Sequence, residues 1–167
     1  MGWLPTLDEL LSGAVRRVLH LEMRDHYEGS PAFAAWLAGD PIDYSAMYGP
    51  WLALVGPLVA RGVDFRRARV VSEPVSSYVR FEYDVTAHAN LAAGERVRWL
   101  PRGRASEVCL PGNDFWLVDD ALLFSLFSGE GVRVGTVAGG PEALAFAVQA
   151  FEAVWALGTD HAEYRPA

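Results

Sequence analysis

The sequence contains no lysine, so all 14 of its basic residues are arginine. Without lysine the chain cannot form a Walker-type phosphate loop, a Schiff base, the ion pair of protein kinases or a lysine general base. A GC-rich genome, which favours alanine, glycine, arginine and valine codons, is the simplest explanation of the missing lysine. These classes of chemistry are excluded whatever the explanation.

Cysteine and long apolar segments are also scarce. The single cysteine, Cys109, excludes an intrachain disulfide and any Cys-x-x-Cys metal or redox site, and its apolar neighbours predict a small buried side chain. No apolar run approaches the roughly 20 residues that span a bilayer. The first residues, Met1–Pro5, lack the basic and apolar regions of a signal peptide. We therefore expect a cytoplasmic protein without a membrane partner.

The charge balance disfavours nucleic acid as a partner. The net charge is −7, whereas contacts to phosphates need a positive field. The arginines nevertheless form two groups in the sequence, which we interpret as solvated side chains at the ends of strands. The alternative is that they form an edge of the sheet that binds an anion. The groups consist of Arg61, Arg66, Arg67 and Arg69, and of Arg96, Arg98, Arg102 and Arg104.

The motifs that mark standard catalytic and metal centres are missing. No serine lies in a Gly-x-Ser-x-Gly elbow, and the Pro-Cys-x-x-Cys half of a zinc deaminase is absent. The nearest candidate for a zinc site is His20, Glu22 and His26, but alternation places the first two on one strand face and the third in a loop. We interpret the histidines as surface residues and expect no metal, no cofactor and no catalytic residue.

Helix and strand signals alternate along the first part of the chain. A capping box at residues 6–9 precedes an apolar helical pattern, and the alternating segment 19–24 predicts a half-buried strand. Residues 30–31, a serine and a proline, start a second helix. A third helix is expected from about Pro50 to Arg61, closed by Gly62.

The second half of the chain predicts a regular α+β arrangement. Strands at 65–72 and 96–100 flank a helix expected from Glu73-Pro74 to Ala92, which makes a βαβ unit with parallel strands. After this unit we expect a hairpin at 115–127 with its turn at Asp119-Asp120, a strand at 132–137 and a C-terminal helix opened by residues 139–141. The chain is thus predicted to be a single α+β domain, residues 1–167, with a mixed sheet, N-terminal helices, a βαβ unit followed by antiparallel hairpins, and a C-terminal helix.

Several linked motifs resemble an actinobacterial family of domains of unknown function. They are Val71-Ser72-Glu73-Pro74, Tyr78-Val79-Arg80-Phe81-Glu82, Gly94-Glu95, Arg98-Trp99-Leu100-Pro101-Arg102 and the segment Asp114 to Asp120, with Leu21-Glu22-Met23-Arg24-Asp25 near the N-terminus. The resemblance covers nearly the whole chain. Members of that family are often encoded beside Xre-type helix-turn-helix regulators, so the resemblance implies a regulatory context and such a regulator as a partner.

The order of elements is similar to one lobe of the phospholipase D-like fold. In that superfamily a His-x-Lys-x4-Asp motif leads into the corresponding hairpin, and its histidine is the nucleophile. If Asp119 is the aspartate of the motif, the histidine and lysine positions fall on Gly112 and Asp114. The resemblance therefore implies a degenerate lobe, like those that bind sugars or effectors in transcription regulators.

The candidate site lies where the strands of the βαβ unit end, because α/β sheets usually hold ligands there. Tyr78 and Glu82 are one helical turn apart, and we expect Arg80, Glu82 and Arg98 to border one pocket. A ring of arginine, glutamate and aromatic residues suits a small anionic or zwitterionic ligand. The alternative is that these residues form ion pairs that fix the helix to the sheet. The expected ligand-binding residues are Arg24, Glu73, Tyr78, Arg80, Glu82, Arg98, Trp99, Asp114 and Asp119.

Three classes of function remain. The first is a non-catalytic ligand-sensing or protein-binding module associated with transcriptional regulation. The second is an enzyme that uses a metal-free arginine, glutamate and tyrosine site on a small anionic or zwitterionic substrate. The third is a nucleic-acid-binding accessory, which the net charge of −7 disfavours. A homodimer is compatible with all three.

Overall fold

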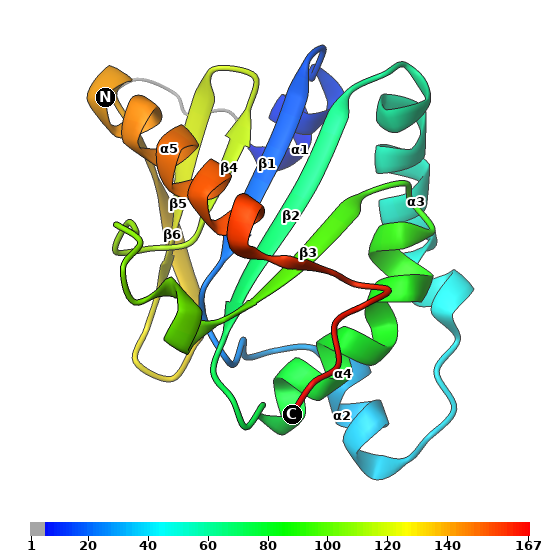
Figure 1. Ribbon diagram of the computed structural model, residues 1–167. Helices are drawn as coiled ribbons and strands as arrows, with labels where there is room; N and C mark the ends of the chain where they lie inside the picture. The colour runs from blue at the N-terminus through cyan, green and yellow to red at the C-terminus, as the bar shows by residue number, and fades with distance from the viewer. Residues whose placement is uncertain (1–5) are drawn as a thin grey trace.

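The computed structural model describes residues 6–167, so Met1–Pro5, on which the expectation about a signal peptide rests, lie outside the described residues. The chain folds around a seven-stranded mixed sheet with the strand order β6-β5-β4-β1-β2-β3-β7 (Figure 1). Its strands are β1 (Arg17–Glu22), β2 (Asp64–Val71), β3 (Arg96–Pro101), β4 (Phe115–Val118), β5 (Ala121–Phe127), β6 (Arg133–Ala138) and β7 (Thr159–Asp160).

Helices cover both faces of this sheet (Figure 1). They are α1 (Leu7–Ser12), α2 (Pro31–Ala38), α3 (Tyr44–Ala60), α4 (Ser77–Thr86) and α5 (Pro141–Leu157). A π-helical turn, Ala87–Leu91, continues α4, and a 3₁₀ turn, Arg102–Ala105, follows β3. No helix within residues 6–167 combines the length and the apolar character that a bilayer-spanning segment needs.

Polar side chains decide where the helices begin. The predicted starts of α1 and α2 at their capping residues are confirmed. The carboxylate of Asp43 caps α3, so this helix starts ahead of the predicted position at Pro50, which lies inside it. Ser76 caps α4, which therefore starts after the predicted position at Glu73-Pro74.

The strand pairing confirms the predicted fold class. Strands β1, β2 and β3 are parallel, and β2, α4 and β3 form the expected βαβ unit. Strands β4, β5 and β6 make the expected antiparallel hairpins. Strand β1 lies in the middle of the sheet, because it pairs in parallel with β2 and in antiparallel with β4.

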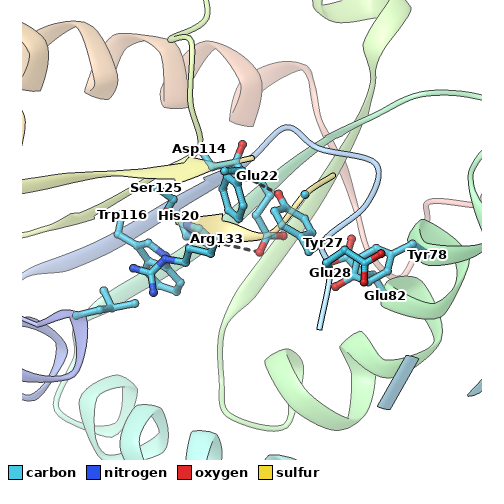
Figure 2. A pocket seen from close by; sticks show the side chains of 13 residues that line it. His20, Glu22, Tyr27, Glu28, Tyr78, Glu82, Asp114, Trp116, Ser125 and Arg133 are labelled. Atoms are coloured by element: carbon cyan, nitrogen blue, oxygen red, sulfur yellow. Dashed lines mark hydrogen bonds and ion pairs between the residues drawn. The ribbon is translucent and has the colours of Figure 1, made fainter. Parts of the chain in front are cut away.

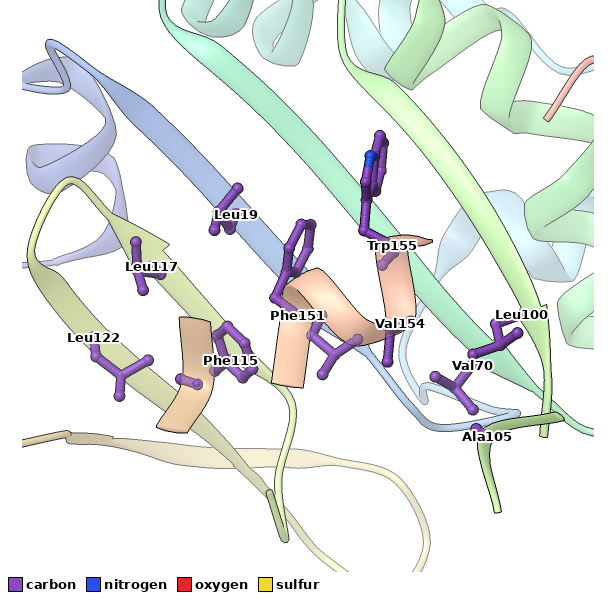
Figure 3. Close-up of a cluster of buried hydrophobic side chains, with 13 residues drawn as sticks. Leu19, Val70, Leu100, Ala105, Phe115, Leu117, Leu122, Phe151, Val154 and Trp155 are labelled. Carbon is purple, nitrogen blue, oxygen red and sulfur yellow. The ribbon is translucent and has the colours of Figure 1, made fainter. Parts of the chain in front are cut away.

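Apolar side chains are buried on both faces of the sheet. Leu19 and Leu21 of β1 face α5 and pack with Phe151 and Val154 (Figure 3). On the opposite face, Val18 packs with side chains of α1 and α3. The prediction of a half-buried strand is wrong for β1, because helices cover the sheet on both sides.

Cys109 also lies in an unexpected environment. Its neighbours Val108 and Leu110 both pack against the core on the α5 side of the sheet. Cys109 between them points away from the core and is exposed, so the prediction of a buried thiol is wrong. Apolar residues on either side of a loop position can be buried while the side chain between them is exposed to solvent.

Candidate functional site

Buried charges occupy the centre of the sheet face that lies under α3 and α4. The register of β1 and β2 places His20 opposite Arg67 and Glu22 opposite Arg69. Successive residues of a strand point to opposite faces, so these four side chains share one face. His20, expected at the surface, is only 6% exposed, and both arginines, expected at solvated strand ends, are also buried. Both expectations are wrong because α3 and α4 cover this face.

Glu22 is the centre of this ion-pair network. Its carboxylate accepts hydrogen bonds from Arg67 Nη1 and Arg69 Nε, each at 2.5 Å, and lies 3.0 Å from His20 Nε2. Burial alone would raise the pKa of Glu22, but the two guanidinium charges outweigh burial and hold this pKa well below its usual range. The carboxylate is therefore ionised, and its position is fixed from three sides.

The imidazole of His20 is held in one orientation. Its Nδ1 atom lies 2.8 Å from the backbone carbonyl oxygen of Phe115, and its ring stacks on Trp116 with the ring centroids 3.6 Å apart. Both ring nitrogens thus face oxygen atoms that accept hydrogen bonds, one from Phe115 and one from Glu22. Both bonds form together only when each nitrogen carries a proton.

Arg67 joins the network to a second buried carboxylate. Its Nε donates to Glu95 at 2.8 Å, and the same carboxylate accepts hydrogen bonds from Trp51 and from Asn90 of the π-helical turn. Glu95 follows Gly94, whose φ of 90° lies in the left-handed region. The turn between α4 and β3 therefore places this carboxylate beside the sheet.

A cleft lies between the charged face of the sheet and α4. It consists of two adjoining cavities of about 330 and 350 Å³. Both cavities are lined by Glu22, Tyr78, Glu82 and Trp116, so the two spaces share a wall. Figure 2 shows these four residues at the first cavity. This volume is within the range of sites for small molecules.

Glu82 of α4 is a buried carboxyl group of the cleft that lacks a hydrogen bond. The residue is only 7% exposed, and its carboxylate accepts no hydrogen bond from any residue in the range 6–167. Its ion-pair partner in that range is Arg69, with Nη2 at 3.7 Å from Oε1. Burial raises the pKa of Glu82 to about 8, an effect that Arg69 partly offsets and the charge of Glu22 increases. At neutral pH this carboxyl can take up or release a proton.

A second carboxyl group borders the cleft beside Tyr27 (Figure 2). Asp114 accepts hydrogen bonds from the Tyr27 hydroxyl at 2.5 Å and from the Met23 amide at 2.9 Å. Burial nevertheless outweighs these bonds and raises the pKa of Asp114. Burial and nearby carboxylates also raise the pKa of Tyr27 well above its usual value, so this hydroxyl stays protonated and donates.

The structure brings together only some of the residues expected to bind a ligand. Tyr78, Glu82 and Asp114 line the cleft. Arg80 is exposed on α4, because a residue two positions from both Tyr78 and Glu82 faces about half a turn away. Arg98 pairs with Asp160 of β7 at the far side of β3. The expectation that Arg80, Glu82 and Arg98 border one pocket is therefore wrong.

Four other expected residues lie outside the cleft. Glu73 accepts a hydrogen bond from the Tyr164 hydroxyl, and the carboxylate of Asp119 accepts hydrogen bonds from the backbone amides of residues 15–17. Arg24 lies over the ring of Phe127 beside a separate cavity of about 290 Å³. Trp99 is fully buried under α4, and the guanidinium of Arg69 lies over its ring at 4.8 Å. Glu73, Asp119 and Arg24 therefore make contacts outside the cleft. Trp99 contacts the ion-pair network through the guanidinium of Arg69.

The sequence contained a signal for the residues that were missed. His20 and Glu22 alternate with leucines, and Arg67 and Arg69 flank an alanine in the next strand, after two helices. Two charged rows of this kind in a βαβ protein indicate neighbouring strands that share a polar face. The site is therefore displaced from the strand ends, where it was expected, to the face of the sheet.

Known proteins resemble the chain in fold. No curated protein matches its sequence. The archaeal chromatin protein TrmBL2, described for its mode of DNA binding, is 11% identical over 90% of this chain and 47% of that chain, with a TM-score of 0.47, so this chain spans about half of its length. Nuc from Salmonella typhimurium, a phospholipase D family member, is 11% identical over 95% of this chain and 88% of that chain, with a TM-score of 0.50.

These comparisons support two sequence-based expectations. The likeness to Nuc confirms the expected phospholipase D-like fold. Residues 5–166 match a family model described as a domain of unknown function, DUF6879, which agrees with the expected kind of family. The match covers nearly all of the sequence, and the chain therefore belongs to the DUF6879 family.

Proposed function

We propose that this chain is a non-catalytic ligand-sensing module of transcriptional regulation and that its ligand binds in the cleft. The observation that carries the proposal is Glu82, a buried carboxyl group without a hydrogen-bond partner among residues 6–167 that faces both cavities. A buried polar group without partners costs about 1–3 kcal/mol. Such a group is retained more readily where a ligand supplies the missing bonds.

The floor of the cleft is built for recognition of a polar molecule. Glu22, Arg67 and Arg69 each form at least two charge-assisted contacts, and Trp116 and Trp99 pack against them. Side chains fixed in this way need little rearrangement when a ligand enters. The proposal therefore favours a small ligand in a preformed site over an extended protein partner.

The regulatory part of the proposal rests on the family resemblance and its implied Xre-type neighbour. A ligand-sensing module of this kind would change its affinity for the regulator when the cleft is filled. The test is co-purification of the chain with the Xre-type protein encoded nearest to it, with and without a cleft ligand. Equal recovery in both conditions would argue against sensing.

A thermal-shift screen of nucleotides, sugar phosphates, amino acids and amines tests binding in the cleft. We expect at least one compound to raise the melting temperature, because a ligand that binds the folded chain stabilises it. Ser125, a buried residue that lines the cleft, offers a blocking variant, Ser125→Leu. The matched control is Ser45→Leu at an exposed position of α3. Stabilisation that survives Ser125→Leu would place the ligand elsewhere.

A second candidate function is an enzyme that uses Glu82 as an acid or base. The pKa of about 8 favours it, because a general acid–base residue works best when its pKa lies near the working pH. The two functions are separated by incubating each stabilising compound with the protein and following it by mass spectrometry. Chemical conversion that is lost in Glu82→Gln would replace the sensing proposal by the catalytic one.

A further inference from the structure

The two buried arginines on the floor of the cleft, Arg67 and Arg69, are already paired with carboxylates of the chain. Arg69 donates to Glu22 and to the hydroxyl of Thr86, and Arg67 donates to Glu22 and Glu95. Two guanidinium groups therefore face two carboxylates. An anionic ligand would have to compete with these buried pairs, and breaking a buried pair is costly.

The carboxyl groups of the cleft, in contrast, have unused acceptor capacity. Glu82 accepts no hydrogen bond from residues 6–167, and Arg69 at 3.7 Å is beyond hydrogen-bond distance. Asp114 borders the same cavity, and Glu28 lies at its exposed rim (Figure 2). Arg133 of β6 also borders this cavity and forms no ion pair within residues 6–167, but it is exposed, whereas the carboxylate of Glu82 is buried.

We propose that the ligand carries a protonated primary amine whose N–H groups donate to the carboxylate of Glu82. This inference rests on the proposed function, because it names the chemical class of the ligand that the cleft would sense. An ammonium group provides three donors and a positive charge, which together supply what Glu82 lacks. A ligand that is zwitterionic fits if its amine, and not its acid group, is directed to Glu82.

Tyrosine rings form the walls around this carboxyl group. Tyr27 and Tyr78 lie with their ring centroids 5.8 Å apart at one cavity, and Tyr48 lines the other. A cation within about 6 Å of an aromatic ring is attracted by its electrons. The apolar body of an amine can therefore lie against these rings while its charged end reaches Glu82.

The same geometry couples binding to proton release. The pKa of about 8 means that Glu82 is mostly protonated at pH 7, whereas an ammonium group pairs with the ionised carboxylate. Besides burial, the charges of Arg69 and Arg67 of β2, Glu22 of β1 and Asp114 beside β4 set this balance. The other titratable or charged groups that line the two cavities are His20 of β1, Tyr27 and Glu28 of the loop after β1, Tyr48 of α3, Tyr78 of α4 and Arg133 of β6. We expect amine binding to release a proton and to weaken roughly 10- to 100-fold from pH 8.5 to pH 6.

Matched probes of opposite charge test the inference. Phenethylamine is compared with 3-phenylpropanoate, and pentane-1,5-diamine with glutarate, by isothermal titration calorimetry at pH 8.5 and pH 6. Titrations at pH 7 in phosphate and in Tris, whose ionisation enthalpies differ, measure the proton release. The variants are Glu82→Gln and, as a control at an exposed glutamate outside the cleft, Glu107→Gln. Circular dichroism of each variant verifies its fold.

The expected result is binding of the amines, little binding of the acids, and at least a tenfold loss of amine affinity in Glu82→Gln only. Binding of the acids without the amines, or amine binding unaffected by Glu82→Gln, overturns the inference but leaves the cleft as a binding site. Absence of binding by both classes at millimolar concentration, with no stabilising compound in the thermal-shift screen, overturns the proposed function as well. The two failures are therefore distinguishable.

Discussion

At the scale of single residues, charge takes the place of apolar packing in the middle of one sheet face. Each charged side chain there depends on its partners, because a buried charge is tolerated only when it is paired and hydrogen-bonded. Arg69 shows this dependence most clearly. It contacts Glu22, Thr86 and Glu82 and lies over the ring of Trp99.

Replacing Arg69 by methionine is expected to destabilise the fold strongly. The change leaves Glu22 with one guanidinium partner fewer in a buried site, and loss of one partner of a buried ion pair costs about 3–5 kcal/mol. Arg80→Met on α4 is the control, since Arg80 is exposed and forms no ion pair within residues 6–167; its effect should stay within about 0.5 kcal/mol. Urea unfolding of both variants measures the difference. Similar small effects would mean that the network contributes little to stability.

Glu82 should make the stability of the fold depend on pH. Its pKa is about 8 in the folded chain and near 4.5 in the unfolded chain, so the folded chain binds the proton more tightly. The stability from this group is therefore complete below about pH 4.5 and is lost as pH rises through about 8. Glu82→Gln removes this loss, and we expect the variant to gain roughly 2–4 kcal/mol over the natural chain between pH 5 and pH 8.5.

Unfolding by urea at pH 5, 7 and 8.5 measures this gain. Glu107→Gln at an exposed position is the control, and its stability difference from the natural chain should be the same at each pH. A difference for Glu82→Gln that is flat with pH, or that favours the natural chain at pH 8.5, would show that Glu82 is ionised in the folded chain at neutral pH.

At the scale of elements, the segment from α4 to β3 builds one wall of the site. The π-helical turn after α4 carries Asn90, which donates to Glu95 across the turn at Gly94. Wide π-helical turns recur at functional sites because they shift the side chains that follow them. The position of Gly94 also depends on close packing, since a Cβ atom there would lie 2.9 Å from a methyl carbon of Val59.

Gly94→Ala is therefore expected to cost more than an alanine at another left-handed glycine. Gly62 has a φ of 92°, close to the 90° of Gly94, but a Cβ atom at Gly62 would meet nothing within 4 Å. Gly62→Ala should cost about 1 kcal/mol for the backbone conformation alone. Gly94→Ala should cost about 1–3 kcal/mol more, because Val59 must move. Equal losses in denaturant unfolding would mean that the contact with Val59 is easily relieved.

The elements could be predicted better than their environments. Short-range signals, such as the Ser30 cap and the hairpin turn at Asp119, act within a few residues and gave the correct element types. The burial of His20 depends on α3 and α4, which cover this face of β1 and follow it only after α2 in the sequence. The shared face of Tyr78 and Glu82 follows from helix geometry alone, whereas their proximity to Glu22 requires the strand order.

At the scale of the whole molecule, the chain has a phospholipase D-like fold but lacks the histidine and the lysine of the His-x-Lys-x4-Asp motif. The resemblance places the motif positions at Gly112, Asp114 and Asp119. In the structure, Asp114 and Asp119 flank the four residues of β4, about 16 Å apart along an extended strand. Asp114 lines the cleft, while Asp119 holds the start of β1 through three backbone amides. Of these two carboxylates, only Asp114 is therefore placed to contact a molecule in the cleft.

We therefore expect the purified chain to show no hydrolysis of bis(p-nitrophenyl) phosphate above the buffer rate. Attack on a phosphodiester needs a nucleophile, which this motif would take from a histidine at the position of Gly112, and lysine is absent from the chain. Arg67 and Arg69 of the cleft, which could stabilise a negative charge that develops there, are already paired with Glu22 and Glu95. The measurement is release of p-nitrophenolate, with Asp119→Asn and Glu82→Gln as comparison variants whose folding is checked by circular dichroism.

Turnover that persists through repurification and disappears in folded Asp119→Asn would restore the motif as an active site. Turnover that disappears only in Glu82→Gln would instead make the cleft catalytic, because the acid–base group would then be a buried carboxyl group that accepts no hydrogen bond from residues 6–167.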